Sequence, residues 1–322
     1  MQAIRVHPAP AASTPYSPSN PAPSSALHLD HNVPIPKPSK PGDILVRVKA
    51  TTVIRDMLTW PETYYHEYAI IGNDISGIVT EVFSQDCKFQ PGDEVFGMAA
   101  ADRGSTWAEY ALLNEDELAL KPRALAFDQA AALPLSAQTA YEALFDHGGI
   151  PVPSVEQAIK NKARSSGQKG QRLLITGAAG AVGIYLVQLA SAAGVHVVAA
   201  TSSNARNEEF LRGLGADEAI EYEVLAKCWD YVKETGVLVS VDSASFNFVE
   251  EHEKRGIRKD GVRALFFIIK GSSKALHYIA ELVDLGTVES FVVGTYPFSK
   301  AREAYDYANG RYSGRGKFVI TI

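Results

Sequence analysis

The stretch RLLITGAAGAVGIYLVQLASAAG, from Arg172 to Gly194, decides how the second half of this sequence folds. Its first apolar residues, 173–175, form the short run that is typical of a buried parallel strand. Three glycines follow, and then a segment that carries apolar side chains at helical spacing. The stretch therefore predicts a strand, a tight glycine-rich turn and a helix in direct succession.

The glycines of this turn favour a phosphate-binding role. Gly180 lets backbone N–H groups approach a pyrophosphate, Gly183 lets helix and strand pack closely, and the helix N-terminus adds partial positive charge. The pattern departs from G-x-G-x-x-G, because Ala178 occupies its first slot. A second apolar strand, residues 195–200, completes a βαβ unit of about 30 residues. We interpret the stretch as a dinucleotide-binding turn; the alternative is a strand, turn and helix without a ligand.

The residues after the second strand indicate which dinucleotide would bind. A carboxylate there would hydrogen-bond a ribose 2′-hydroxyl and repel a 2′-phosphate, and residues 201–207 contain none. They offer Ser202, Ser203 and Arg206, whose hydroxyls and guanidinium suit a phosphate. We therefore predict NADP(H); the alternative is a solvated loop in which a serine caps the next helix.

Composition and charge describe a globular chain long enough for two domains. It has 322 residues, of which 46% are hydrophobic, and a formal charge of −6. The basic residues are scattered, so no nucleic-acid partner is expected, and no apolar run reaches the roughly 18 residues of a membrane span. The N-terminus lacks the layout of a secretion signal, which makes a cytoplasmic location the expectation. Cys87 and Cys228 are too few for a disulfide framework or a four-thiolate zinc site.

The pattern of elements changes along the chain from strands to alternating helices and strands. Residues 1–124 are rich in turns and predict a mostly β domain, with a Pro/Ser/Ala-rich surface loop at 8–25. The rest predicts a doubly wound parallel sheet, entered through a linker at 159–170. Expected strands are 3–6, 44–48, 77–82, 94–98, 107–113, 172–175, 195–200, 218–222, 237–241, 262–269, 288–293 and 317–322. Expected helices after the turn helix are 208–214, 226–233, 248–254, 273–285 and 298–309.

Several further stretches resemble the zinc-free quinone oxidoreductase branch of the medium-chain dehydrogenase/reductase superfamily. In chain order they are Pro41–Asp43, Gly72–Gly77, Pro91–Gly97, Ala130–Tyr141, the glycine turn, Gly215–Asp217 and Gly314–Lys317. Their order and spacing make the resemblance specific, and it covers nearly the whole chain. It implies a GroES-like domain, residues 1–124 completed by 297–322, and a Rossmann domain, residues 125–296, with the active site in the cleft between them.

The resemblance also implies the chemistry. Zinc-dependent relatives carry a catalytic cysteine and a Gly-His-Glu motif, and this chain has Val53–Asp56 and Gly72-Asn73-Asp74 at the matching places. No metal is therefore expected, because too few suitable ligands converge. The implied reaction is hydride transfer from NADPH to a small organic substrate, either an α,β-unsaturated carbonyl or a quinone.

Individual cofactor contacts follow from the same resemblance. The expected contacts, from pyrophosphate through 2′-phosphate and adenosine to nicotinamide, are Gly180, Ala181, Val182, Gly183, Ser202, Ser203, Arg206, Tyr222, Thr139, Phe267 and Lys317. Three of them have plain alternatives. Thr139 could be an ordinary helix residue, Phe267 a core residue and Lys317 a solvated charge.

The proton donor is less clearly marked. The family position that often carries an aromatic hydroxyl follows the first-domain aspartate, but here Met57–Trp60 follow Asp56. Tyr64 is the candidate catalytic residue, with Tyr65 and His66 as neighbouring alternatives. Water could also deliver the proton.

The Rossmann domain is shorter than the family pattern. In the family a helix and a strand separate the equivalent of Tyr222 from the segment that residues 225–240 resemble. Here only residues 223–224 intervene, so about 25 residues are missing. We predict a sheet one strand short, with residues 237–243 in its fourth slot, and a weakened cofactor site. The family resemblance also implies a homodimer, joined through an edge strand at 288–293.

Two alternatives to a reductase follow from that loss. One is a non-redox isomerase or cyclase on the same scaffold, because a fold alone does not determine chemistry. The other is a non-catalytic binding protein. Consumption of NADPH by an enone or quinone would distinguish the reductase from both.

Overall fold

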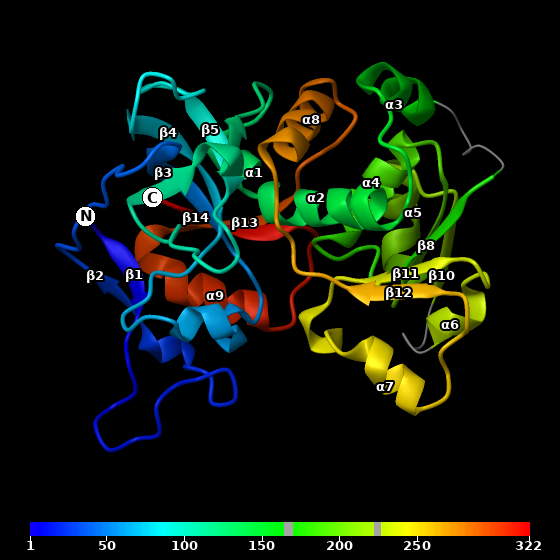
Figure 1. Cartoon of the computed structure of the whole chain (residues 1–322), viewed down its shortest axis with the longest axis horizontal. Helices are drawn as coiled ribbons and strands as arrows, with labels where there is room; N and C mark the ends of the chain where they lie inside the picture. The colour runs from blue at the N-terminus through cyan, green and yellow to red at the C-terminus, as the bar shows by residue number, and fades with distance from the viewer. Residues whose placement is uncertain (164–169, 222–226) are drawn as a thin grey trace. The chain divides into compact units, whose positions relative to one another are not determined.

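The computed structural model describes residues 1–163, 170–221 and 227–322, which divide into two compact units. Unit 1 comprises residues 1–135, 270–284 and 289–322, and unit 2 comprises residues 136–269 and 285–288. Unit 1 is rich in antiparallel sheet, whereas unit 2 alternates parallel strands with helices (Figure 1). The predicted α/β fold, with one mostly β part and one Rossmann-like part, is confirmed.

Unit 1 is built on a seven-stranded sheet. Its central strand β3 (Asp43–Val53) pairs antiparallel with three neighbours, and nine of its eleven residues are buried. The last strand of the chain, β14 (Lys317–Thr321), pairs with β3, so the C-terminus returns to this unit as predicted. The other strands are β4 (Asp74–Val82), β5 (Glu94–Met98), β6 (Tyr110–Asn114), β7 (Leu118–Leu120) and β13 (Val292–Pro297).

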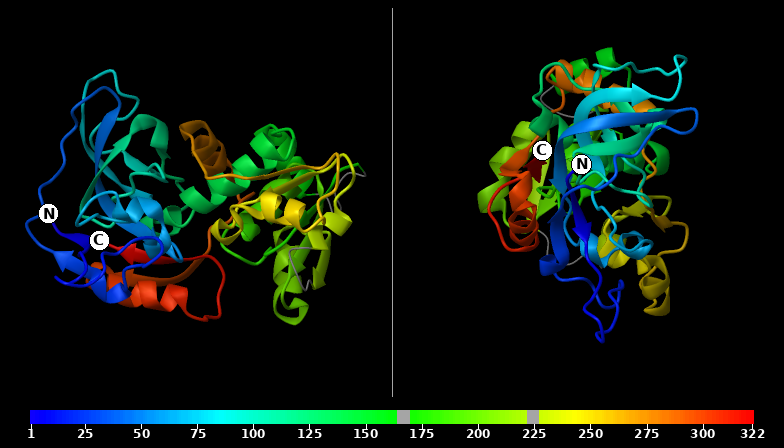
Figure 2. Two further views of the ribbon diagram at one scale, coloured as in Figure 1. Left: turned by 60° about the horizontal axis from the view of Figure 1, so that its bottom comes forward. Right: turned by 90° about the vertical axis from the view of Figure 1, so that its left-hand side faces the viewer.

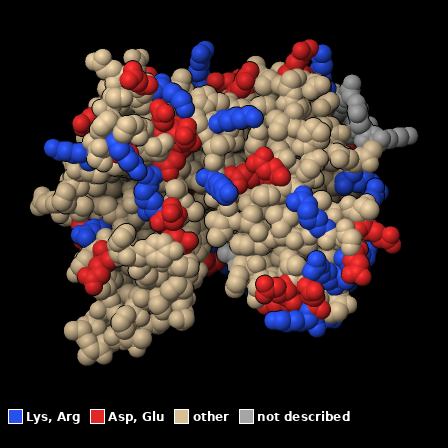
Figure 3. Space-filling model, viewed as in Figure 1, with Lys and Arg blue, Asp and Glu red and all other residues tan. Residues whose placement is uncertain are grey.

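A smaller layer of unit 1 surrounds the chain's N-terminus. The strands β1 (Ala3–Val6) and β2 (Leu27–Asp30) pair antiparallel, and α9 (Ala301–Asn309) packs beside them in a shared apolar cluster (Figure 2). Residues 8–25 between the two strands form the surface loop that the sequence predicted, ending in a short 3-10 helix, Ser24–Ala26. That loop carries no charged side chain, whereas acidic and basic side chains are interspersed over the face shown in Figure 3.

Further helical segments also belong to unit 1. Two consecutive 3-10 turns, Met57–Thr59 and Pro61–Tyr64, follow β3, and α1 (Phe127–Ala131) packs on the sheet. The helix α8 (Ser273–Asp284) packs against β7. The sequence places this helix in the second domain, whereas in the structure it groups with unit 1.

The parallel strands of unit 2 form two separate sheets. The first has the order β10-β9-β8, with β8 (Arg172–Ile175), β9 (His196–Thr201) and β10 (Glu218–Glu221). Among the residues that the structure describes, the second consists of β11 (Val237–Ser240) and β12 (Arg263–Phe266). The described α-helices of this unit are α2 (Pro134–Tyr141, beginning in unit 1), α3 (Val155–Lys162), α4 (Gly183–Ala192), α5 (Asn204–Leu214), α6 (Cys228–Tyr231) and α7 (Phe248–Lys254). A π-helical segment, Glu142–His147, continues α2.

The prediction that residues 237–243 fill a slot beside the first Rossmann strand was wrong. Within the described residues β11 pairs only with β12, and the two strands pack on their own apolar cluster around Trp229, Phe248 and Val262. The six-stranded order 3-2-1-4-5-6 would place one more strand between β8 and β11. The shortened sequence therefore leaves the sheet in two pieces rather than closing it.

Two other expectations need correction. Residues 159–162 belong to α3 and not to a linker, and the rest of that predicted linker lies partly outside the described residues. Residues 288–291 form no strand; β13 begins at Val292 and pairs with β14 in unit 1, not at an edge of unit 2. No helix within the described part of the chain is long and apolar enough to cross a membrane.

Candidate functional site

The turn after β8 has the geometry that the sequence predicted. Gly177 adopts a positive φ of 62°, and a Cβ atom on Gly183 would lie 2.2 Å from the Gly177 carbonyl oxygen. Ala178 N–H donates to the carbonyl of Ala200 at 3.1 Å, which ties the turn to β9. Glycine is therefore required at position 183, since any side chain there would displace the turn.

This turn fits the pyrophosphate of a dinucleotide. Gly177 and Gly180 are exposed, so no side chain shields their backbone. The helix α4 starts at Gly183, and the first N–H groups of a helix have no partner within it. Together with the helix dipole, these donors favour an anion at the positions of Ala181, Val182 and Gly183.

The predicted 2′-phosphate residues lie at the same sheet edge. The strands β8 and β9 run parallel, so the glycine turn and the loop after β9 leave the sheet on one side. Ser202 and Arg206 are exposed there. Ser203 occupies the N-cap position of α5, but its side chain makes no capping hydrogen bond, which weakens the alternative of a purely structural serine.

A carboxylate also lies at this edge, and sequence reasoning missed it. Glu221, the last residue of β10, is aligned with Thr201 at the end of β9. Its Oε1 accepts a hydrogen bond from Asn204 N–H, the first residue of α5, at 2.7 Å. The position of Glu221 in the sequence could have revealed this carboxylate. It lies at the end of the third parallel strand, which ends at the same edge of the sheet as the second.

The remaining predicted contacts of unit 2 are placed less decisively. Thr139 is buried within α2. Phe267 follows β12, is half-buried, and has its ring 4.4 Å from the ring of His147. Tyr222 lies outside the described residues. The roles of all three toward the nicotinamide or adenosine stay predictions.

Lys317 forms a buried ion pair in unit 1. Its Nζ lies 2.5 Å from Asp74 Oδ2, and the two side chains are only 5% and 0% exposed. The same carboxylate accepts from Thr52 Oγ1 at 2.5 Å and from Leu135 N–H, at the N-terminus of α2, at 2.7 Å. The alternative of a solvated lysine is therefore wrong, while contact with a cofactor remains a prediction.

The residues at the zinc-motif positions do not fit a metal. Asn73 is buried, and its Nδ2 donates to the carbonyls of Ala99 and Ala100 at 3.2 and 3.3 Å. The Asp74 carboxylate is already neutralised by Lys317. Among the described residues, no three His, Cys, Asp or Glu side chains gather as metal ligands would.

Tyr64 is held by the backbone on both sides of its hydroxyl. The O–H donates to the Leu58 carbonyl, and the oxygen accepts from Ala22 N–H at 2.8 Å. Burial raises the pKa of this phenol above its ordinary value. Proton donation to a substrate would require the hydroxyl to leave the Leu58 carbonyl, so its catalytic role stays a prediction.

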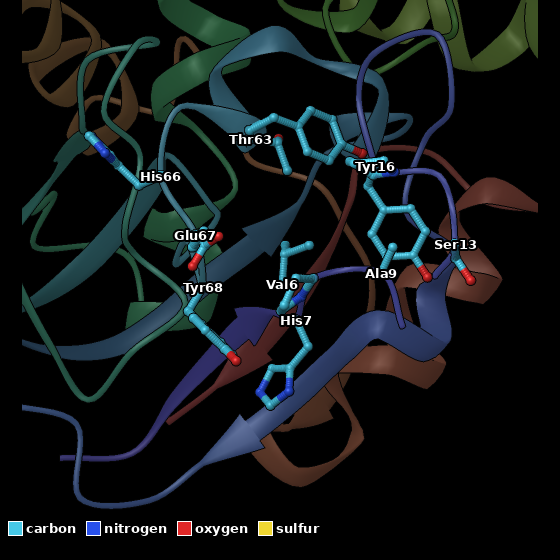
Figure 4. Close-up of a pocket in the computed structure, with 12 residues that line it drawn as sticks. Val6, His7, Ala9, Ser13, Tyr16, Thr63, His66, Glu67 and Tyr68 are labelled. Atoms are coloured by element: carbon cyan, nitrogen blue, oxygen red, sulfur yellow. The ribbon is translucent and has the colours of Figure 1, made fainter. Parts of the chain in front are cut away.

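A pocket of about 250 Å³ lies beside Tyr64 in unit 1. The surface loop contributes Ala9, Ser13 and Tyr16 on one side, and residues 66–68 face them across the opening (Figure 4). The lining combines aromatic rings with hydroxyl and imidazole groups, which suits a small organic molecule. Sequence reasoning did not foresee a pocket beneath the loop.

Comparison with known proteins agrees with this architecture. The alcohol dehydrogenase GroES-like domain family matches residues 40–123, and the zinc-binding dehydrogenase family matches residues 181–262. The probable zinc-binding oxidoreductase of Arthroderma benhamiae, described as mitochondrial, is 30% identical and covers 93% of this chain and 94% of its own. The mitochondrial NAD(P)H oxidoreductase RTN4IP1 of Mus musculus is 28% identical, covering 93% of this chain and 86% of its own.

A solved structure extends the agreement to the whole chain. The quinone oxidoreductase of Coxiella burnetii superposes with a TM-score of 0.79 at 25% identity and covers 100% of this chain and 99% of its own. The sheet-rich unit with its C-terminal strand, the glycine turn and the matched relatives are thus mutually consistent. This chain belongs to the medium-chain dehydrogenase/reductase superfamily, in its quinone oxidoreductase branch, and is an oxidoreductase of the kind that uses a nicotinamide cofactor.

Proposed function

We propose that this protein is an NADPH-dependent, zinc-independent reductase of α,β-unsaturated carbonyls or quinones. The observation that carries the proposal is the shared sheet edge of unit 2, where the glycine turn lies beside Ser202, Ser203 and Arg206. The names of the relatives, an NAD(P)H oxidoreductase and a quinone oxidoreductase, support both the cofactor class and the substrate class.

In this reaction the nicotinamide, when bound, supplies the hydride. The backbone at Ala181–Gly183 would hold the pyrophosphate, and Arg206 would pair with the 2′-phosphate. An enolate formed by the substrate then takes a proton from Tyr64 or from water. The Tyr64 phenol is protonated at neutral pH, as a donor must be, and burial raises its pKa further.

The neighbourhood of Asp74 supports the proposed zinc independence. A metal would have to displace the Lys317 ammonium from a carboxylate that is fully buried and already accepts three hydrogen bonds. We expect a chelator to leave turnover unchanged. Loss of activity in chelator with recovery on added zinc would contradict this part of the proposal.

The first test is the loss of NADPH absorbance during incubation with a panel of enones and quinones. We expect turnover with at least one class and none with the Gly183→Val variant, whose side chain would displace the phosphate turn. The Gly213→Ala variant is the matched control, because a Cβ atom there meets nothing within 4 Å. Turnover that survives in Gly183→Val would refute the assigned cofactor site.

A second test concerns Tyr64. If it donates the proton, Tyr64→Phe lowers kcat by about 10²–10⁴-fold with little change in KM. If the hydroxyl is only structural, the variant loses about 1–3 kcal/mol of stability and keeps its kcat. Tyr231→Phe is the control, since Tyr231 is 66% exposed and has no role in the proposed site.

One observation favours the non-redox alternative, an isomerase or cyclase. The break between β8 and β11 separates the glycine turn from the strand that precedes Phe267, and could weaken the cofactor site. Conversion of substrate without NADPH would establish this alternative. Substrate binding without any conversion would instead support a non-catalytic protein.

A homodimer also remains a proposal. The strand β13 ends the sheet of unit 1, so its outer edge has backbone groups that a second copy could pair. Light scattering after size-exclusion chromatography tests it, and a monomer at micromolar concentration would end this proposal.

A further inference from the structure

We propose that Glu221 is a specificity-determining residue that opposes the 2′-phosphate, so that the site accepts NADH as well as NADPH. The inference rests on the proposed function, because it concerns the adenosine end of the same cofactor site. It differs from the sequence expectation, which found no carboxylate after the second strand and predicted NADP(H).

The position of Glu221 carries the first step. In dinucleotide-binding folds, an acidic residue at the end of the second strand hydrogen-bonds the ribose 2′-hydroxyl and excludes a 2′-phosphate. Here that strand ends at Thr201, and Glu221 is the residue aligned with it on β10. The third strand thus supplies, at the same edge, the carboxylate that the second strand lacks.

The contact made by Glu221 carries the second step. Its carboxylate accepts the N–H of Asn204 at 2.7 Å, so it lies at the N-terminus of α5. That end of the helix would otherwise attract a phosphate through its free N–H groups and its dipole. A 2′-phosphate would therefore meet a negative charge where the helix alone would offer a positive one.

Arg206 provides the opposing influence. It is exposed and lies on the first turn of α5, two residues beyond Asn204. A phosphate monoester carries a charge of about −1.5 to −2 at neutral pH. The positive charge of Arg206 attracts the 2′-phosphate, and the negative charge of Glu221 repels it. The two effects offset each other, so neither NADH nor NADPH is strongly excluded.

The test is the equilibrium affinity of the full chain for NADH and NADPH, measured by nicotinamide fluorescence. We expect the two Kd values of the natural protein to differ by less than about tenfold. Glu221→Gln should tighten NADPH about fivefold, which corresponds to about 1 kcal/mol of relieved repulsion, and should not tighten NADH. Glutamine can still accept the Asn204 N–H, so the helix end keeps its partner.

Two further variants complete the set. Glu218→Gln changes a carboxylate at the other end of β10, where it pairs with Arg172 and His196, and should leave the ratio of the two Kd values unchanged. Arg206→Ala should weaken NADPH about fivefold and spare NADH. Calorimetry with 2′,5′-ADP and 5′-AMP repeats the comparison with ligands that lack the nicotinamide.

The outcomes separate the inference from the function on which it rests. Binding of both cofactors with a ratio that Glu221→Gln shifts toward NADPH and Glu218→Gln leaves unchanged supports the inference. A natural protein that binds NADPH over 100-fold more tightly, with a ratio unmoved by Glu221→Gln, overturns it and leaves the reductase proposal standing. If none of the four ligands binds, the proposed function fails and the inference fails with it.

Discussion

The main sheet of unit 1 is continuous, whereas the described parallel strands of unit 2 are divided between two sheets. In unit 1 the central strand β3 has neighbours on both sides and is almost wholly buried. In unit 2 the sheet is divided, and every residue of β11 is half-exposed. Parallel strands are normally covered on both faces, so the second arrangement forgoes burial that the first retains. We therefore expect unit 2 to be the less stable of the two units.

The same difference divides the cofactor site. The glycine turn, the Ser/Arg loop and Glu221 all belong to the three-stranded piece, where we propose that the adenosine end binds. Phe267 follows a strand of the two-stranded piece. We therefore expect the loss of one strand to affect the nicotinamide end more than the phosphate end.

The largest expected effect is at the buried ion pair of unit 1. Asp74→Ala leaves the Lys317 ammonium buried without its partner and removes the cap on Leu135, and should lower the free energy of unfolding of unit 1 by about 3–5 kcal/mol. Hydrogen exchange of the β3 and β4 amides measures it.

The matched variant replaces both charges. Asp74→Asn combined with Lys317→Met removes the uncompensated ammonium and should recover part of the loss, because the desolvation cost disappears with the charges. If Asp74→Ala lowers the free energy of unfolding by less than about 1 kcal/mol, the buried pair contributes no more stability than an exposed ion pair does. The contrast between the two units would then lose its best support.

The glycine turn gives the next effect. Gly183→Ala places a Cβ atom 2.2 Å from the Gly177 carbonyl oxygen, so the turn must shift. We expect a loss of about 1–3 kcal/mol in unit 2 and at least tenfold weaker NADPH binding. Calorimetry and thermal unfolding measure the two quantities. The control Gly213→Ala lies in α5 with open space and should stabilise the protein by about 0.5–1 kcal/mol.

Particular elements show how much of the fold and of the candidate site could be predicted from the sequence. The glycine turn was predictable because each glycine has a local geometric task that the sequence displays. The pairing of Lys317 with Asp74 was not, since the two residues lie 243 positions apart and only the sheet register brings them together. Glu221 was missed for the same reason: its meaning depends on alignment with Thr201 across two strands.

The broken sheet illustrates a different limit. The shortened sequence showed that a strand was missing, but it did not show whether the remaining strands would close up. Closure would have required β11 to leave the cluster around Trp229 and Phe248, which it shares with β12. Local sequence patterns do not show with which of two partners a strand will pack.

A smaller effect is expected from pH in the two-stranded piece of unit 2. His252 is buried beside Trp229, whose Nε1–H donates to His252 Nδ1 at 2.7 Å. Burial, followed by the nearby charge of Arg255, lowers the pKa of this imidazole. Because the folded pKa lies below the unfolded one, stability is complete above about pH 6.5 and falls as the pH drops below that value.

Hydrogen exchange of β11 and β12 amides between neutral and mildly acidic pH, corrected for intrinsic rates, measures this effect. We expect protection to fall toward acid and His252→Phe to abolish the pH dependence. The β3 amides of unit 1 serve as the internal reference. Equal pH dependence in β3 and β11 would show that His252 is not the cause.

The smallest effect should come from an ion pair of the same chemistry in unit 2. Lys160 Nζ lies 2.6 Å from Glu156 Oε1 within α3, but the side chains are 65% and 78% exposed. Lys160→Ala should cost no more than about 0.5 kcal/mol, with less at high salt, because water screens the charges in both states. Thermal unfolding at two salt concentrations measures it. If Lys160→Ala lowered the free energy of unfolding as much as Asp74→Ala, burial would not explain the difference expected between the two ion pairs.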